Sequence, residues 1–218
     1  MPRYGAIDAD YAGRLVSATP SRQLLETADG RRLRREQNRE AVIEALIALF
    51  HDGVYEPSSA QIAERAGLSP RSLFRYFDDV DDLNRAAIEQ QLETARPFLD
   101  VDARPDDPLL RRIERLVAAR IRLFEAITPG ARAARICAHR HPVVAAQVHD
   151  SRTYLRAQIA RLFARELDGV RAALLPAVDA LCSFETYELL RAGQRMSRAR
   201  TAAALEAALT SLLTDPSS

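Results

Sequence analysis

The sequence predicts an all-α protein in which a small N-terminal three-helix domain precedes a larger helical domain. Apolar residues recur at helical spacing through most of the chain, and no stretch of useful length alternates in the manner of a β-strand. Pro and Gly residues interrupt the helical segments at intervals. We expect residues 1–30 to form a disordered arm, residues 31–80 the N-terminal domain, and residues 81–218 the C-terminal helical domain.

The composition is that of an ordinary folded chain, with 218 residues, 47% of them apolar and 28% charged. No segment approaches the ~20 apolar residues needed to cross a bilayer, and the N-terminus lacks the apolar stretch of a signal peptide. We therefore expect no contact with a membrane and a cytoplasmic location. All basic residues are arginine, yet the net charge is only +1, which argues against a general polyanion binder.

Two short helices are predicted around a glycine turn in the N-terminal domain. Ser58 and Gln61 have the spacing of a capping box, which starts the first helix, and Gly67 ends it. Ser69 is placed to cap the second helix, with Pro70 in its first turn. This is the pattern of a helix-turn-helix unit, whose second helix enters the major groove of DNA.

The second helix has an inward and an outward side at ~100° per residue. Leu73, Phe74 and Phe77 are expected to pack inward. Arginine bonds guanine edges and hydroxyl groups bond bases or phosphates, so the outward side suits DNA. The candidates on this helix and its cap are Ser69, Arg71, Ser72, Arg75 and Tyr76. The same pattern also occurs in helical bundles that bind no nucleic acid, where the arginines would only be solvated.

Residues 33–90 resemble the N-terminal domain of the TetR family of bacterial transcriptional regulators. The resemblance lies in the Ser58 cap, the run IAERAGLS from Ile62 to Ser69, the run LFRYF from Leu73 to Phe77, and Leu83. Beyond this region only the architecture is similar. The resemblance implies a homodimeric repressor that binds an inverted repeat in double-stranded DNA, with a small-molecule effector in the C-terminal domain.

Two positions depart from the family pattern and bear on how phosphates are held. The family usually has Tyr where this chain has Phe74 and Lys where it has Val80, and both family residues contact phosphate. Val80 lies in an acidic run, 78–82, that would repel DNA. The remaining phosphate candidates are Ser58, Ser59, Tyr76 and a basic cluster of Arg31, Arg32, Arg34 and Arg35. The cluster precedes a helix predicted from about Leu33 to His51, and either follows the minor groove or is merely solvated.

Two charged residues interrupt the apolar stripes of helices in the C-terminal domain. Arg120 interrupts a helix predicted over residues 108–128 and ended by Pro129-Gly130, and Glu185 interrupts one predicted over residues 170–192. A buried guanidinium needs a partner. We expect the two side chains to share one interior, either as a direct pair or in a pocket for a polar ligand group.

The other residues predicted to line the effector pocket are Phe124, Tyr154 and Gln158, although they suit ordinary core and boundary positions equally well. Further helices are predicted over 80–95, 131–140, 142–167 and 198–213. The last helix is rich in Ala and Leu, and the TetR resemblance implies that the last two helices pair with their symmetry mates. The predicted dimer residues are Leu205, Ala208, Leu209 and Leu212.

Other chemistry has weaker support in the sequence. Cys137, His139 and His141 invite a metal interpretation, but a structural zinc site needs about four ligands and no second pair has suitable spacing. No Gly-rich phosphate loop and no nucleophile with a recognisable base is present, so we predict no catalytic residues, no cofactor and no metal. The alternatives are a regulator without an effector or controlled by a protein partner, and an all-helical enzyme that uses the Cys137 region.

Overall fold

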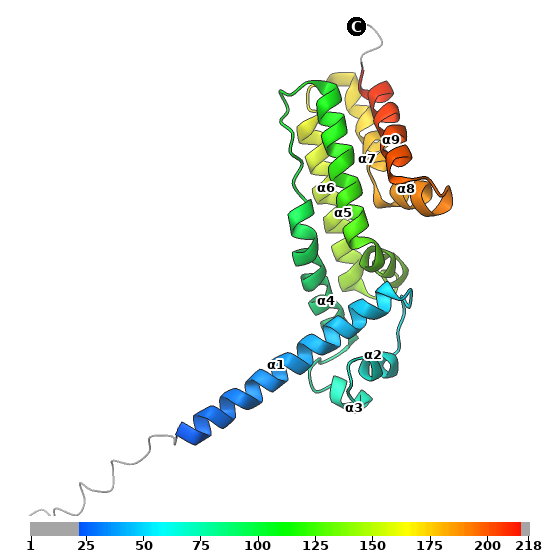
Figure 1. Cartoon of the computed structure of the whole chain (residues 1–218). Coiled ribbons are helices and arrows are strands. Elements are labelled where there is room, and N and C mark those ends of the chain that lie inside the picture. The colour runs from blue at the N-terminus through cyan, green and yellow to red at the C-terminus, as the bar shows by residue number, and fades with distance from the viewer. Residues whose placement is uncertain (1–21, 215–218) are drawn as a thin grey trace, which may run out of the picture.

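The computed structural model describes residues 22–214, with side chains for residue 30 and residues 32–214. Every regular element in this part of the chain is helical, as predicted. A long first helix projects from the molecule, two short helices lie beneath it, and an elongated bundle stands above (Figure 1). The main helices are α1 (Arg22–His51), α2 (Ser59–Arg65), α3 (Pro70–Leu73), α4 (Val80–Ala95), α5 (Leu109–Cys137), α6 (Pro142–Leu162), α7 (Leu175–Leu181), α8 (Phe184–Glu188) and α9 (Arg198–Leu213). Short 3-10 segments η2 (Arg96–Phe98) and η3 (Gly169–Leu174) and a π-helical turn η4 (Leu189–Gly193) complete the order.

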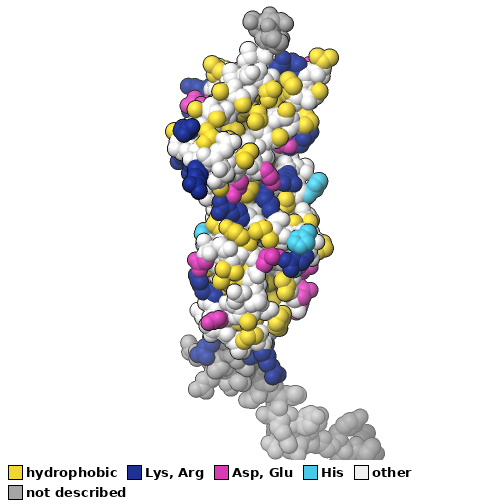
Figure 2. All heavy atoms as spheres, turned by 90° about the vertical axis from the view of Figure 1, so that its right-hand side faces the viewer, with side chains coloured by type: hydrophobic (Ala, Val, Ile, Leu, Met, Phe, Trp, Pro, Cys, Tyr) yellow, Lys and Arg dark blue, Asp and Glu magenta, His cyan; other side chains and the backbone are white. Residues whose placement is uncertain are grey.

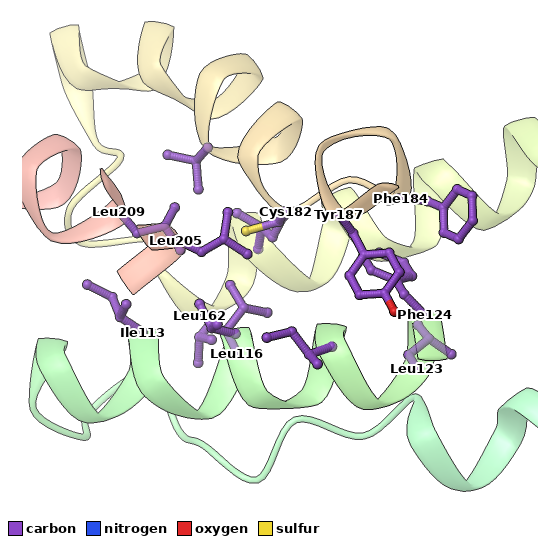
Figure 3. Packing of buried hydrophobic residues seen from close by; sticks show 14 of the residues in the cluster. Ile113, Leu116, Leu123, Phe124, Leu162, Cys182, Phe184, Tyr187, Leu205 and Leu209 are labelled. Atoms are coloured by element: carbon purple, nitrogen blue, oxygen red, sulfur yellow. The ribbon is translucent and has the colours of Figure 1, made fainter. Parts of the chain in front are cut away.

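The buried side chains form two separate hydrophobic cores. The smaller core joins α1, α2 and α3 to the first half of α4, which contributes Leu83, Ala86 and Ala87. The larger core lies in the bundle of α5 to α9 and includes Ala95 at the end of α4. Figure 3 shows part of this larger core, where leucines of α9 face α5 and three aromatic rings gather farther along. Helix α4 is therefore packed into both cores.

Local capping signals produce the helix-turn-helix that the sequence predicts. The Ser58 amide donates to Gln61 Oε1 at 2.9 Å, and the Gln61 amide donates to Ser58 Oγ at 3.3 Å. Gly67 has a φ of +69°, the left-handed conformation that favours glycine at a helix end. Ser69 caps α3 by accepting a hydrogen bond from the Ser72 amide at 3.2 Å.

The start of α1 differs from the prediction. The helix begins at Arg22, so residues 22–30 of the expected disordered arm are helical, and the rest of the arm lies outside the described residues. No proline interrupts the segment from Arg22 to His51. A single glycine inside a helix, here Gly30, costs only roughly 1 kcal/mol, which does not end the helix.

The Pro129-Gly130 pair does not end α5, which continues to Cys137. Proline removes one backbone hydrogen bond, but buried residues lie on both sides of the pair, Leu123 and Phe124 before it and Ala131 and Ala133 after it. A Cβ on Gly130 would lie 2.7 Å from Gln91 Oε1, so the missing side chain allows α4 to pack closely against α5. Tertiary packing thus overrides the breaker signal here.

The predicted helix over residues 170–192 is broken into η3, α7, α8 and η4. Pro176 lies in the first turn of α7, and Ser183 caps α8 by accepting from the Thr186 amide at 3.2 Å. Helix α6 also ends earlier than expected, at Leu162. The prediction for α9 was correct, because Ser197 caps a helix from Arg198 to Leu213.

A buried ion pair that the sequence analysis missed joins α5 to the end of α6. Arg112 is 3% exposed, and its guanidinium donates to both carboxylate oxygens of Glu166 at 2.8 and 2.5 Å. It also donates to the carbonyls of Leu162 and Asp107 and lies over the Phe163 ring at 5.4 Å. The hydrogen bonds from Arg112 lower the pKa of Glu166 against the opposing effect of burial.

Removing one partner of this pair should destabilise the protein strongly. We expect Arg112→Met to lower the free energy of unfolding by ~3–5 kcal/mol, because Glu166 would be left as an unpaired charge, and Arg112→Met with Glu166→Leu to recover much of the loss. The lowered folded-state pKa of Glu166 contributes stability above the unfolded value of about 4.3, and this is lost as pH falls through the folded-state pKa. Denaturant melts between neutral and acid pH measure both effects. Equal losses in the single and double variants would contradict this role.

Candidate DNA-binding surface and effector cavity

Helix α3 and the turn after it present two arginines outward and bury two apolar residues. Arg71 and Arg75 are exposed, whereas Leu73 and Phe77 are 2% and 1% exposed. Ser69 and Ser72 share a hydroxyl–hydroxyl hydrogen bond of 2.8 Å, which orients both groups at the start of the helix. Guanidinium groups on this side match the donors needed for guanine edges.

Two predictions on this helix were wrong. Phe74 does not pack inward but is 50% exposed, and Tyr76 does not point freely outward. The Tyr76 hydroxyl accepts a hydrogen bond from Asn38 Nδ2 at 2.8 Å, and its ring packs partly against the smaller core. Helix α3 ends at Leu73, and the turn after it leaves Phe74 at the surface and brings Tyr76 against Asn38 of α1.

The remaining phosphate candidates differ in their surroundings. Ser58 is exposed and Ser59 is half-buried at the start of α2. Arg32, Arg34 and Arg35 are exposed along α1, and Arg32 pairs with Glu36 at 3.0 Å. The side chain of Arg31 lies outside the described residues. Because this cluster is helical, it does not form an extended arm before the first helix, and its contact with DNA stays a prediction.

The acidic run before and within α4 has a structural role. Asp79 caps the helix by accepting from the Asp82 amide at 2.7 Å, and Asp81 and Asp82 occupy the first turn. Carboxylates are favoured at a helix N-terminus by the partial positive charge of the unpaired amides. The run therefore stabilises the start of α4.

A cavity of about 420 Å³ lies where α4, α5, α6, α7 and α8 meet. Its wall is mostly apolar. The polar residues include Asn84 and Gln91 from α4, and α5, α6 and α8 provide Arg135, Arg152 and Glu185. This size and composition are typical of sites for small molecules. The apolar wall includes Ile88, Leu92, Phe124, Val148 and Leu155.

Of the five predicted pocket residues, the structure places Phe124 and Glu185 in the cavity wall and leaves out Arg120, Tyr154 and Gln158. Arg120 is 2% exposed and donates to Gln158 Oε1 at 2.9 Å and to the Leu155 carbonyl at 3.0 Å. Gln158 in turn donates to the Leu99 carbonyl and to the Tyr154 hydroxyl. Burial lowers the pKa of Arg120. These bonds fasten α6 to α5 and to the segment after η2.

Arg120 and Glu185 neither pair with each other nor share a pocket, so both alternatives for them were wrong. The break between α7 and α8 takes Glu185 off the apolar stripe that the sequence analysis assumed. Glu185 Oε1 instead accepts from Arg135 Nε at 2.8 Å and from Arg152 Nη2. Partial burial would raise the pKa of Glu185, but the bonds from Arg135, its own backbone and Arg152 lower it to about 2.

A set of contacts ties the end of α5 to the helix-turn-helix domain. Arg132 donates to both carboxylate oxygens of Glu188 at 2.6 and 3.2 Å and to the Tyr55 hydroxyl at 3.4 Å. The Cys137 thiol donates to the Tyr55 carbonyl at 3.3 Å. Tyr55 lies in the connection between α1 and α2, just before the Ser58 cap. We call Tyr55, Arg132 and Glu188 the interdomain clamp.

One further ion pair and one histidine–carboxylate contact cross between the same regions. Arg140 pairs with Glu56, and His141 Nδ1 lies 2.7 Å from Asp81 Oδ1 at the start of α4. His139 Nδ1 lies 2.7 Å from the carbonyl of Ile136. Cys137, His139 and His141 thus have separate partners, and no three possible metal ligands converge within residues 22–214. These pairings join residues far apart in the chain, so sequence spacing gave no signal for them.

The predicted dimer residues are only partly at the surface. Leu205 and Leu209 are 6% and 0% exposed and pack in the protomer's own core, which corrects their assignment to an interface (Figure 3). Ala208 and Leu212 are half-buried. The exposed side of α9 instead carries Ala203, Ala204 and Ala207. None of the described helices is long and apolar enough to cross a membrane.

Comparison with known proteins agrees with this architecture. Residues 42–87 match the family model described as bacterial regulatory proteins, tetR family. A TetR-family transcriptional regulator from Streptomyces coelicolor superposes with a TM-score of 0.63 and 24% identity, over 81% of this chain and 80% of that one. A Rhodococcus sp. protein assigned to the same family superposes with a TM-score of 0.61 and 17% identity, over 82% of this chain and 100% of that one. The multidrug binding protein EbrR, in complex with imidazole, superposes with a TM-score of 0.56 and 19% identity, over 84% of this chain and 93% of that one. A comparison with curated proteins gave no match.

The geometry and these likenesses define a class of protein with a helix-turn-helix domain joined to a helical domain that contains a cavity. Because the sequence identities are low, the solved structures show a similarity of fold alone. The matched family model covers the helix-turn-helix with the end of α1 and the first half of α4. Residues 42–87 thus match the tetR family of bacterial regulatory proteins, and the chain as a whole shares the fold of solved structures assigned to that family.

Breaking the interdomain clamp should loosen the connection between α1 and α2. The hydrogen bond to Glu188, followed by that to Tyr55, raises the pKa of Arg132, which is the sign of a bonded guanidinium. We expect Arg132→Met to speed amide hydrogen exchange in residues 53–61 and to leave α9 unchanged. Arg122→Met is the matched control, because Arg122 is an exposed arginine on the same helix. Unchanged exchange in residues 53–61 would show that the clamp does not hold this connection.

Proposed function

We propose that this protein is a transcriptional repressor that binds an inverted-repeat operator as a homodimer and is controlled by a small molecule in the C-terminal cavity. The observation that carries the proposal is that one helix, α4, packs into the helix-turn-helix core and also lines the cavity. A ligand that moves α4 would therefore move the DNA-binding domain. We expect such a regulator to act in the cytoplasm and to need no catalysis of its own.

The cavity and the clamp support control by a ligand over the two alternatives without one. A helical domain that only dimerised would need no space of about 420 Å³ lined by residues of α1 and of α4 to α8. Helix α8 provides Phe184 and Glu185 to the cavity wall and Glu188 to the interdomain clamp. A ligand could thus act on the DNA-binding domain through α8 as well as α4. Such a ligand must have different affinities for the two arrangements of the domains.

The DNA-binding role of α3 can be tested on an operator selected by the protein from random duplexes. We expect Arg71→Ala and Arg75→Ala each to weaken operator binding by ~1–3 kcal/mol if the arginine contacts guanine. Arg111→Ala is the control, because Arg111 is exposed at the far end of α5. Fluorescence anisotropy at fixed salt gives the dissociation constants. Full affinity in the double variant Arg71→Ala with Arg75→Ala would exclude this surface.

The proposed dimer uses the exposed face of α9 with the neighbouring Leu189, which is 57% exposed. Hydrophobic side chains gather on the upper part of the side of the molecule that carries α8 and α9 (Figure 2). Small side chains allow two such helices to approach closely across a two-fold axis. The interface would then consist of surface alanines and not of the buried leucines of α9.

Charges on this face should separate the protomers and leave each one folded. We expect Ala204→Glu with Ala207→Glu to give a folded monomer, since both positions are exposed in the protomer. Ala157→Glu, at an exposed position of α6, is the control and should remain a dimer. Light scattering gives the mass and circular dichroism the fold. A double variant that stays dimeric would place the interface elsewhere.

A further inference from the structure

We propose that the cavity binds an amphipathic carboxylate, a molecule with an apolar body and one carboxylate head held by Arg152 and Arg135. This inference rests on the proposed function, because it names the chemical class of the small molecule. It depends on the side chains at the charged end of the cavity, where α5, α6 and α8 each contribute one ionic group.

The apolar part of the cavity defines the body of the ligand. Ile88 and Leu92 come from α4, Phe124 from α5, and Val148 and Leu155 from α6. Phe124 is held by edge-to-face contact with Phe184, at a centroid distance of 5.6 Å. Burying an apolar body against such a wall favours binding in proportion to the area removed from water, but provides little orientation.

The two arginines at the charged end of the cavity have one carboxylate between them. Arg135 and Arg152 share a single carboxylate, that of Glu185, through the same oxygen atom. The other carboxylate in the cavity wall, Asp179, is paired with Arg156 at 3.3 Å. A ligand with one carboxylate would therefore balance the charge of the Arg135, Arg152 and Glu185 group.

The two arginines also have hydrogen-bond donors to offer. Among the described residues, Arg152 donates only to Glu185, through Nη2, and a guanidinium has five N–H donors. Arg135 is oriented by its position 4.3 Å over the Phe184 ring and by its bond to the Ala131 carbonyl. A planar carboxylate matches the fork of donors on a guanidinium. The geometry thus provides a head-group site beside the apolar wall.

Cationic and neutral ligands fit the charged end less well. A cation would have to take Glu185 from two arginines, and these already hold the pKa of that carboxyl at about 2. It would also leave both guanidinium groups without their partner. A neutral alcohol could use the apolar wall but would gain only an uncharged hydrogen bond at its head, which is weaker than a charge-assisted bond.

A carboxylate head would also act on α8. It would share Arg135 and Arg152 with Glu185, and so weaken the bonds that hold the start of α8 against α5 and α6. Glu188, one turn later, accepts from Arg132 in the interdomain clamp. The head group would therefore bind at the start of α8, one turn before the residue that is connected to the α1–α2 segment.

The test uses the full chain and calorimetric titration with decanoate, 1-decanol, decylammonium and 2-naphthoate below their aggregation limits. We expect a carboxylate to bind more tightly than the alcohol and the ammonium by about tenfold or more. Arg152→Gln should lose about tenfold or more in carboxylate affinity and keep its weak affinity for decanol. Arg161→Gln, an exposed arginine of α6 outside the cavity, should bind like the unmodified protein.

Several results would overturn the proposal. These are equal or tighter binding of decanol or decylammonium, full carboxylate affinity in Arg152→Gln, and no binding of either carboxylate. Operator binding by the same preparation separates this from failure of the proposed function. Specific DNA binding without carboxylate binding would reject only the ligand class, whereas carboxylate binding without specific DNA binding would reject the regulatory function and leave the site.

Discussion

Helix α4 belongs to two hydrophobic cores at once, and the relation between the two domains depends on this constraint. Leu83, Ala86 and Ala87 are buried with the helix-turn-helix, while Ala95 is buried in the bundle. Because helical geometry fixes the angle and the rise between these positions, the two cores cannot rotate about α4 without losing buried contacts. The side chain of Gln91 on α4 lies close to Gly130 on α5 in the same region.

The interdomain clamp adds a second connection beside α4. Arg132 is on the bundle, Tyr55 is beside the cap of α2, and Glu188 is on the short helix that also lines the cavity. The cavity is therefore bounded by both elements that hold the DNA-binding domain. A ligand there would change how the helices pack. Packed helices tend to switch between discrete arrangements and do not deform continuously. This is the physical basis for linking the cavity to DNA affinity.

Local signals predicted the parts of the fold that depend on local chemistry. The caps at Ser58, Ser69 and Ser197 and the turn at Gly67 lie where the sequence placed them, because each depends on neighbours within four residues. The cavity was less predictable. Phe124 and Glu185 were found as wall residues, but Arg135 and Arg152 were missed, since they meet Glu185 only through tertiary packing. The continuation of α5 through Pro129 and the Arg112–Glu166 pair were missed for the same reason.

The central claim, that the state of the cavity sets the affinity for DNA, can be measured without a ligand by filling the cavity with a side chain. Ala134 lines the cavity on α5, and Ala157 is exposed on α6 outside it. Fluorescence anisotropy gives the operator affinity of Ala134→Phe, with Ala157→Phe as the control and thermal melts to verify folding. We expect folded Ala134→Phe to bind the operator several-fold more weakly, about 1 kcal/mol or more, and the control to be unchanged. Equal operator affinity in a folded Ala134→Phe variant would contradict the account.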